Sequence, residues 1–269
     1  MEQLIKTKEF LLSQGFSDPE IGVVLGTGLN ELLNSVEIIT SIPYAEIPNF
    51  PVSTVEFHKG NLVYGKMANK KVLVMQGRFH AYEGYSMQQI VFPIRVMKLL
   101  GVKKLFLSNA AGGINQNFKK GNLVLIDDHI NLQSGNPLTG KNVDELGERF
   151  PDMSRPYSKQ LSEKLFEKAN ELNIDLKEGV YAAVNGPNLE TRAEYRYLKV
   201  IGANMVGMST VPEVIAANHM QLPCAAISVI TDECDPDNLH PVNIREIIEV
   251  AGKADTKLSR LFYETIKAL

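Results

Sequence analysis

A run at 71–75 that is apolar after Lys71 and contains two β-branched valines is followed closely by a polar cluster between Gly77 and Gly84. The run predicts a buried strand. The cluster brings a guanidinium, an imidazole, a phenol and a carboxylate within six residues. In open α/β sheets, ligands bind beyond the carboxyl ends of strands. Arg78 and His80 can converge there on one anion, although an ordinary solvated loop would carry the same residue types.

Further strand-like runs end in the same way, which predicts an α/β fold with several polar strand ends. The turn at 26–28 permits close backbone approach to a ligand but lacks the third glycine of a dinucleotide fingerprint. Ser209 precedes an expected helix, where an anion is favoured. The polar ends lie at 26–28, 77–83, 109–113, 188–190 together with 208–209, and 231–232. If they meet on one face, they form one site.

Helix starts can be predicted from capping patterns. Ser86 with Gln89, and Thr210 with Glu213, both have the form of a capping box. A third helix is expected over about 156–173, with Pro156 in its first turn. An amphipathic helix from about 243 closes the chain.

Two segments are predicted to be irregular. Residues 43–60 form a long loop that carries His58, and long loops in compact chains are often functional. Residues 127–157 are expected to leave the sheet. Asp127, Asp128 and His129 within this segment could ligate a metal in principle. Structural hydrogen bonding is the favoured interpretation, because the sequence shows no partner cluster for them.

Composition excludes several classes of protein. The chain has 269 residues without repeats or linker-like segments, so one domain over 1–269 is the simplest organisation. A net charge of −3 disfavours nucleic-acid binding, and the short apolar runs disfavour membrane insertion. Cys224 and Cys234 are too few for a disulfide framework, and we expect a cytoplasmic protein. No Ser/His/Asp order, Walker lysine or metal quartet is evident, so positioning and electrostatics are the expected chemistry.

Three segments, 77–84, 109–113 and 206–213, resemble the hallmark motifs of the trimeric purine nucleoside phosphorylases, in the right order. The resemblance covers nearly the whole chain. It implies a single α/β domain in which helices flank a distorted mixed β-sheet, as in the purine and uridine phosphorylase fold. It also implies a homotrimer and no cofactor, with inorganic phosphate as co-substrate.

The resemblance also implies site residues. Phosphate would be held by Thr27, His58, Arg78, His80, Ala110 and Ser209. Ribose would contact Tyr82 and Met208, and Phe150 would reach a neighbouring subunit's site. The purine would be lined by Ala111, Gly112, Leu189, Glu190, Val206 and Asp232. Among these residues, His80, Glu190 and Asp232 would be catalytic, and Glu83 is expected to be structural.

The expected reaction is reversible phosphorolysis of purine nucleosides to base and ribose 1-phosphate, with inosine and guanosine preferred. A carboxylate at Glu190 can accept from N1–H of a 6-oxopurine. Asp232 stands where many 6-oxopurine-specific members have asparagine, and Leu189 replaces an aromatic residue. The family histidine for the ribose 5′-hydroxyl is missing near 243–246, where Ile244 or a neighbour takes its place and His240 is a possible substitute.

Three alternatives remain open. Asp232 and the missing histidine favour an enzyme that accepts adenosine or 5′-methylthioadenosine. A catalytically silent nucleoside-binding protein could share the fold. A glycoside hydrolase would need an acid/base pair that flanks the scissile bond.

Overall fold

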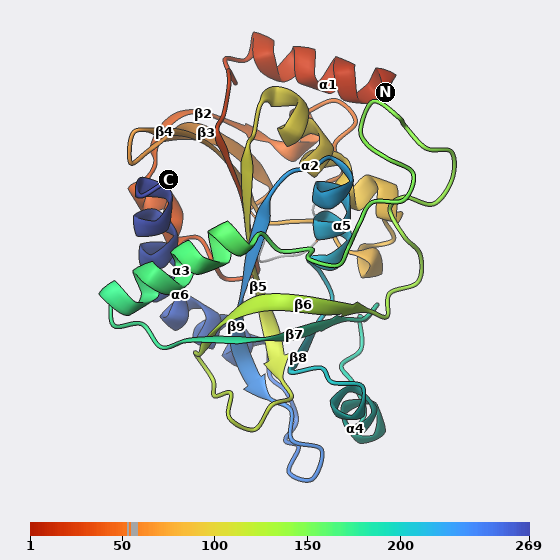
Figure 1. The fold of residues 1–269 in the computed structure, drawn as a ribbon, viewed down its shortest axis with the longest axis vertical. Coiled ribbons are helices and arrows are strands. Elements are labelled where there is room, and N and C mark those ends of the chain that lie inside the picture. The colour runs from red at the N-terminus through yellow and green to blue at the C-terminus, as the bar shows by residue number, and fades with distance from the viewer. Residues whose placement is uncertain (53, 55–58) are drawn as a thin grey trace.

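The computed structural model describes residues 1–52, 54 and 59–269 (Figure 1). The helices of these ranges are α1 (Glu2–Ser13), α2 (Met87–Leu100), α3 (Lys159–Glu171), α4 (Arg192–Val200), α5 (Val211–His219) and α6 (Ile244–Lys267). The strands are β1 (Ile21–Leu25), β2 (Glu37–Pro43), β3 (Asn61–Met67), β4 (Lys70–Gln76), β5 (Lys104–Gly113), β6 (Leu123–Asn131), β7 (Leu176–Ala183), β8 (Met205–Gly207) and β9 (Cys224–Glu233). Short 3-10 turns lie at η1 (Glu31–Ser35), η2 (Tyr44–Glu46) and η3 (Ala81–Glu83).

All described strands join one mixed sheet in the order β2-β3-β4-β1-β5-β8-β7-β6-β9. Because β9 also pairs with β5, the second half of the sheet closes on itself through β5-β8-β7-β6-β9. Strands β4, β1, β5 and β9 run parallel to one another. Their carboxyl ends therefore meet at one edge, which is where an α/β sheet binds ligands. The chain thus has the predicted α/β fold with a distorted mixed sheet.

Helices cover both faces of this sheet, and each face has its own apolar core. Helices α1, α2 and α5 pack together on one face, through residues such as Leu11, Ile94 and Val214. Helices α3 and α6 pack on the other, through Leu165 and Phe262 among others. Figure 1 shows these groups on different sides of the sheet, with α4 beyond β7 and β8. The strand ends are thus fixed from two sides.

The predicted helix starts were confirmed in part. Ser86 and Gln89 form the expected capping box at α2. Helix α3 begins at Lys159 rather than 156, because Ser158 provides the cap by accepting from the Leu161 N–H. The capping box predicted for α5 was wrong, because Thr210 makes no side-chain cap.

Strands reach into both segments that were predicted to be irregular. Residues 127–131 continue β6, in which Asp128 pairs with Val180 across a bulge, so the chain leaves the sheet only after Asn131. The exposed edge strand β2 extends to Pro43, at the start of the predicted long loop. Similarly, β5 does not stop at Ser108 but runs to Gly113, because both β8 and β9 pair with its second half.

Among the described residues, no helix is long and apolar enough to cross a membrane.

Candidate active site

The polar strand ends meet around one cavity of about 150 Å³. Its lining comes from all five predicted segments, which the sequence places up to two hundred residues apart. The lining residues are Gly26, Thr27, Arg78, His80, Tyr82, Asn109, Ala110, Ala111, Gly112, Leu189, Glu190, Val206, Gly207, Met208, Ser209, Thr231, Asp232 and Ile247. Of the residues singled out for the site, His58 lies outside the described residues and Phe150 lies elsewhere.

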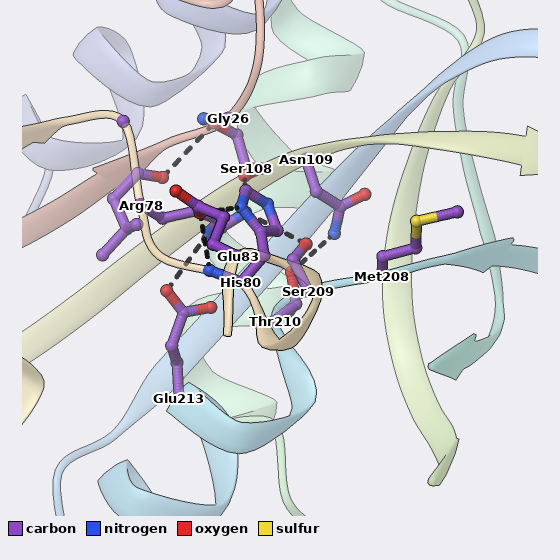
Figure 2. Close-up of polar contacts among 12 residues, drawn as sticks. Gly26, Arg78, His80, Glu83, Ser108, Asn109, Met208, Ser209, Thr210 and Glu213 are labelled. Carbon is purple, nitrogen blue, oxygen red and sulfur yellow. Dashed lines mark hydrogen bonds and ion pairs between the residues drawn. The ribbon is translucent and has the colours of Figure 1, made fainter. Parts of the chain in front are cut away.

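Arg78 is the central cation of this cavity, and its side chain is almost fully buried, at 1% exposure. Figure 2 shows its contacts. The guanidinium donates to the Glu213 carboxylate (Nε to Oε1, 3.1 Å) and to the Ser108 carbonyl (Nη1 to O, 2.6 Å). A longer bond joins Nη1 to Ser209 Oγ at 3.4 Å. Buried charges persist when they are paired and hydrogen-bonded, so this guanidinium has a fixed position.

His80 stands beside Arg78 in a defined orientation. Its Nδ1 lies 3.0 Å from Glu83 Oε1, and its ring stacks on Tyr82 with the centroids 4.6 Å apart. Burial lowers the pKa of His80, against the opposing effect of Glu83. A neutral ring that donates from Nδ1 to a carboxylate has Nε2 as its acceptor. The cavity therefore has a hydrogen-bond acceptor beside a cation.

Glu83 is held as an anion beneath this histidine. Burial would raise the pKa of Glu83, but hydrogen bonds from His80 and Thr54 outweigh it and lower the pKa to about 2. The carboxylate also accepts from the His80 backbone N–H at 2.9 Å. This geometry agrees with a structural role for Glu83.

Ser209 and Thr210 lie at the start of α5, and Ser209 lines the cavity beside Arg78. Thr210 has a φ of +69°, a conformation that β-branched residues rarely adopt. Asn109 Nδ2 donates to its hydroxyl at 2.8 Å, and the Ser209 hydroxyl lies 3.1 Å from it. Strained backbone held by a hydrogen-bond network is characteristic of functional sites, and the amino end of α5 adds positive potential.

Glycines allow the strands to approach closely around the cavity. A Cβ on Gly26 would lie 2.8 Å from both Asn109 Cα and the Ser108 carbonyl oxygen. A Cβ on Gly112 would lie 2.6 Å from Cys234 Sγ and 3.2 Å from Asp232 Oδ2. Both glycines therefore leave space that a neighbouring element fills.

Two carboxylates, Glu190 and Asp232, also line the cavity. Burial raises the pKa of Glu190, and the Asp232 charge adds to that rise, whereas a hydrogen bond with Tyr195 opposes it. Asp232 accepts from Thr231 Oγ1 at 2.9 Å and from Cys234 Sγ at 3.1 Å. The cavity thus combines a cationic region with an acidic one.

Phe150 and His240 lie apart from this cavity. The Phe150 side chain is 84% exposed, under the Arg149 guanidinium at 5.6 Å from the ring centroid. His240 lines an adjoining cavity of about 410 Å³ that shares Asp232 and Ile247 with the first. At the position considered for Ile244, it is Ile247, one turn into α6, that faces the cavity.

Sequence reasoning missed Glu213 and Ile247 as residues of the site, and it placed Thr231 at a polar strand end without giving it a role. Glu213 has the spacing of a helix cap, and nothing in the sequence around it indicates that its carboxylate pairs with Arg78, 135 positions away. Within the described ranges, no group of three or more His, Cys, Asp or Glu side chains is arranged to hold a metal ion.

Comparisons with known proteins agree with this geometry. A family model described as "Phosphorylase superfamily" matches residues 20–267. Purine nucleoside phosphorylase 1 of Geobacillus stearothermophilus is 48% identical over 94% of this chain and 92% of its own. Purine nucleoside phosphorylase of Mus musculus is 45% identical over 92% and 88%. Schistosoma mansoni purine nucleoside phosphorylase in complex with inosine superposes with a TM-score of 0.94, at 39% identity over 100% and 97% of the two chains.

The parallel strand ends enclose a cavity that contains a buried cation, and the family model matches nearly the whole chain. The chain therefore belongs to the phosphorylase superfamily. Within it, the chain belongs with the purine nucleoside phosphorylases, and it is accordingly an enzyme of the pentosyltransferase class.

Proposed function

We propose that this enzyme cleaves purine nucleosides reversibly with inorganic phosphate, prefers inosine and guanosine at neutral pH, and needs no other cofactor. The observation that carries the proposal is one cavity that holds both a buried guanidinium at Arg78 and a carboxylate at Glu190. A dianion and a purine N1–H are the ligands that these two groups suit. Tyr82 and Met208 line the same cavity, and their uncharged side chains would contact the sugar.

The phosphate would bind against Arg78, His80, Ser209, Thr27 and the Ala110 backbone. Arg78 supplies fixed charge, and the amino end of α5 supplies potential. Neutral His80 can accept the proton of a monoprotonated phosphate through Nε2. Phosphate held under C1′ then acts as the nucleophile and balances the positive charge that develops on the sugar. The protein needs no nucleophile of its own, which fits catalysis by positioning and electrostatics.

The purine would lie among Ala111, Gly112, Leu189, Val206 and the two carboxylates. Ionised Glu190 accepts from N1–H of hypoxanthine or guanine. A protonated Asp232 could donate to N7 of the leaving base, where negative charge accumulates. We assign catalytic roles to His80, Glu190 and Asp232 on these grounds.

Asp232 also supports a second candidate, turnover of adenosine or 5′-methylthioadenosine. Its carboxylate already accepts from two protein donors, and an ionised carboxylate can accept from a 6-amino group but cannot donate to a 6-oxo group. A relative in the same superfamily, Schistosoma mansoni purine nucleoside phosphorylase, has been solved in complex with adenosine, at a TM-score of 0.94 and 38% identity.

We further propose that the enzyme is a cytoplasmic homotrimer in which Phe150 completes a neighbour's site. The Phe150 side chain is 84% exposed in the single subunit, and aromatic residues are enriched in the buried cores of protein interfaces. Contact with a neighbouring subunit would bury it. Phe150→Ala should then raise the nucleoside KM and leave the phosphate KM unchanged.

Initial rates with inosine, guanosine, adenosine and 5′-methylthioadenosine, each with and without phosphate, test the proposal. Phosphate-dependent release of hypoxanthine and guanine at the highest kcat/KM is the expected result. Binding without turnover would instead favour a silent nucleoside-binding protein, and release without phosphate would favour a hydrolase.

Glu190→Gln tests the base contact, with Glu163→Gln as the control because Glu163 is exposed on α3. Glutamine keeps an oxygen that can accept from N1–H but removes the charge, which lowers the contribution of the hydrogen bond from about 1.5–3 to about 0.5–1.5 kcal/mol. We therefore expect kcat/KM for inosine to fall roughly 10-fold and kcat/KM for adenosine to be affected less. Equal losses for both nucleosides would refute the assignment.

A further inference from the structure

The turn that carries Thr27 into the cavity is supported from two sides. The Gly26 carbonyl accepts from the Leu29 N–H at 3.1 Å, so Thr27 and Gly28 form the tip of the turn. On the β5 side, the Gly26 N–H donates to Ser108 Oγ at 3.2 Å. The position of the Thr27 side chain therefore also depends on how the turn is held from its other side, by α6.

The turn lies directly on α6. Gly28 has a φ of +75°, and a Cβ at this position would lie 3.2 Å from Ala251 Cβ and 3.5 Å from the Ile248 carbonyl oxygen. Glycine suits both the positive φ and the close approach. The next side chain, Leu29, is fully buried in the apolar core that α6 covers. Turn and helix thus form one packed unit.

Asp255 joins the residues that follow this turn to the same helix. Its side chain is 2% exposed, and its Oδ2 accepts from the backbone N–H groups of Asn30 at 2.5 Å and Glu31 at 2.7 Å. These N–H groups lie at the start of η1, where a helix leaves its first donors without partners of its own. The other oxygen, Oδ1, accepts from Ser259 Oγ at 2.9 Å. Because both oxygens accept hydrogen bonds, the carboxylate has a fixed position.

These contacts come from one side of α6. Residues 247, 251, 255 and 259 follow one another at intervals of four, which places them along one side of a helix. Ile247 lines the cavity, and Ala251 meets the turn. Asp255 holds the residues after the turn, and Ser259 supports Asp255. A shift of the carboxylate would therefore move the turn relative to the cavity.

We propose that Asp255 is a positioning residue for the phosphate substrate, because its carboxylate fixes the chain after the turn on α6 and so sets the position of Thr27. This inference rests on the proposed function, in which Thr27 contacts phosphate. Arg78 has its own contacts to β5 and α5, so the cationic part of the phosphate site does not depend on Asp255. The residues proposed to contact the purine also come from other segments. Loss of Asp255 should therefore affect phosphate and not the nucleoside.

The test compares three substitutions of Asp255 by the KM for phosphate and the KM for inosine. Asp255→Ala removes the acceptor of two N–H groups, and Asp255→Glu keeps the carboxylate but moves it outward by one methylene. We expect each to raise the phosphate KM roughly 10-fold, the lower end of what a hydrogen bond to a charged group contributes, and to leave the inosine KM unchanged. Asp255→Asn should stay close to the parent, because its amide oxygen can accept from both N–H groups while its NH2 donates to Ser259 Oγ.

Ser259→Ala is the matched control, because it removes a hydrogen bond from the same carboxylate on the oxygen that does not contact the turn. It should lower stability in urea unfolding but leave the phosphate KM unchanged. If Asp255→Ala does not fold, Asp255→Glu decides. An unchanged phosphate KM in the folded Ala and Glu variants would overturn the inference, and so would an equal rise in the KM of both substrates. A rise in Asp255→Asn or Ser259→Ala as large as that in Asp255→Ala would also overturn it.

Thr27→Val separates this inference from the proposed function. If Thr27→Val leaves the phosphate KM unchanged, the proposed contact of Thr27 with phosphate fails, and the inference fails with it. If Thr27→Val raises the phosphate KM but the Asp255 variants do not, only the role of Asp255 fails. In the double variant Thr27→Val/Asp255→Ala, we expect a phosphate KM no higher than that of the weaker-binding single variant, because Asp255 acts through Thr27. Additive effects of the two substitutions would refute that route.

Discussion

The Arg78–Glu213 pair allows the structural and ligand-binding roles of one buried cation to be separated. Both side chains are nearly inaccessible, at 1% and 3% exposure, and their atoms are 3.1 Å apart. Replacing Arg78 by methionine keeps the volume but leaves the Glu213 carboxylate buried without its cation. Breaking a buried ion pair from one side costs about 3–5 kcal/mol. At about 2 °C per kcal/mol for a chain of this size, the unfolding midpoint should fall by about 6–10 °C.

The double variant Arg78→Met/Glu213→Gln removes both charges at once. Replacing both members of a buried ion pair often changes stability little. Most of the decrease in the unfolding midpoint temperature should therefore be recovered in the double variant. Phosphate binding should not return, because the loss of a charged donor costs about 1.5–3 kcal/mol, or roughly 10- to 100-fold in the phosphate KM.

Thermal unfolding followed by circular dichroism, together with phosphate saturation curves at fixed inosine, measures both quantities. Glu213→Gln alone serves as the control and should retain most of the phosphate affinity, because the guanidinium keeps its bonds to Ser108 and Ser209. A double variant with normal phosphate KM would refute the placement of Arg78 against phosphate. An Arg78→Met variant as stable as the parent would refute the energetic argument.

Two further substitutions test the architecture of the site. Gly26→Ala should force the end of β1 away from the β5 backbone at Asn109, lower the free energy of unfolding by about 1–3 kcal/mol through overpacking and raise the phosphate KM. Gly252→Ala is the control, because a Cβ at Gly252 would face open space. Equal stability of the two variants in urea unfolding would contradict the argument. Glu83→Gln should be less stable than the parent at pH 7, because folding lowers the pKa of Glu83 from 4.5 to about 2. The difference in the free energy of unfolding between variant and parent should disappear as the pH falls from about 4.5 towards 2. A difference that does not depend on pH would count against this linkage.

The sequence allowed the α/β fold and the polar strand ends to be predicted, because both depend on local patterns. Apolar β-branched runs indicated β1 and β4, and parallel topology then brings their ends together. Ser86 also capped its helix as expected, since a capping box involves residues only three apart. Where the interaction is short-range, the prediction was correct.

Predictions failed where a distant partner decided the outcome. Glu213 has cap spacing relative to Thr210, but the buried guanidinium of Arg78, just beyond the end of β4, offers a charged donor and pairs with Glu213 instead. Asp127 and Asp128 suggested loop, yet pairing with β7 keeps the segment in β6. The exposed edge strand β2 lacks the buried pattern of a core strand. None of these partners can be identified from neighbouring residues.

The closure of the sheet has a consequence for the order of folding. Strand β5 contributes the middle of the cavity, and its partner β9 pairs with it from Leu105 with Cys224 to Gly113 with Glu233. Contacts of such long sequence separation form late, because a large loop must close before they are gained. During synthesis, the first half of the chain must wait with one edge of β5 exposed until β9 leaves the ribosome. That edge is where a nascent chain of this enzyme is most open to aggregation and to chaperones.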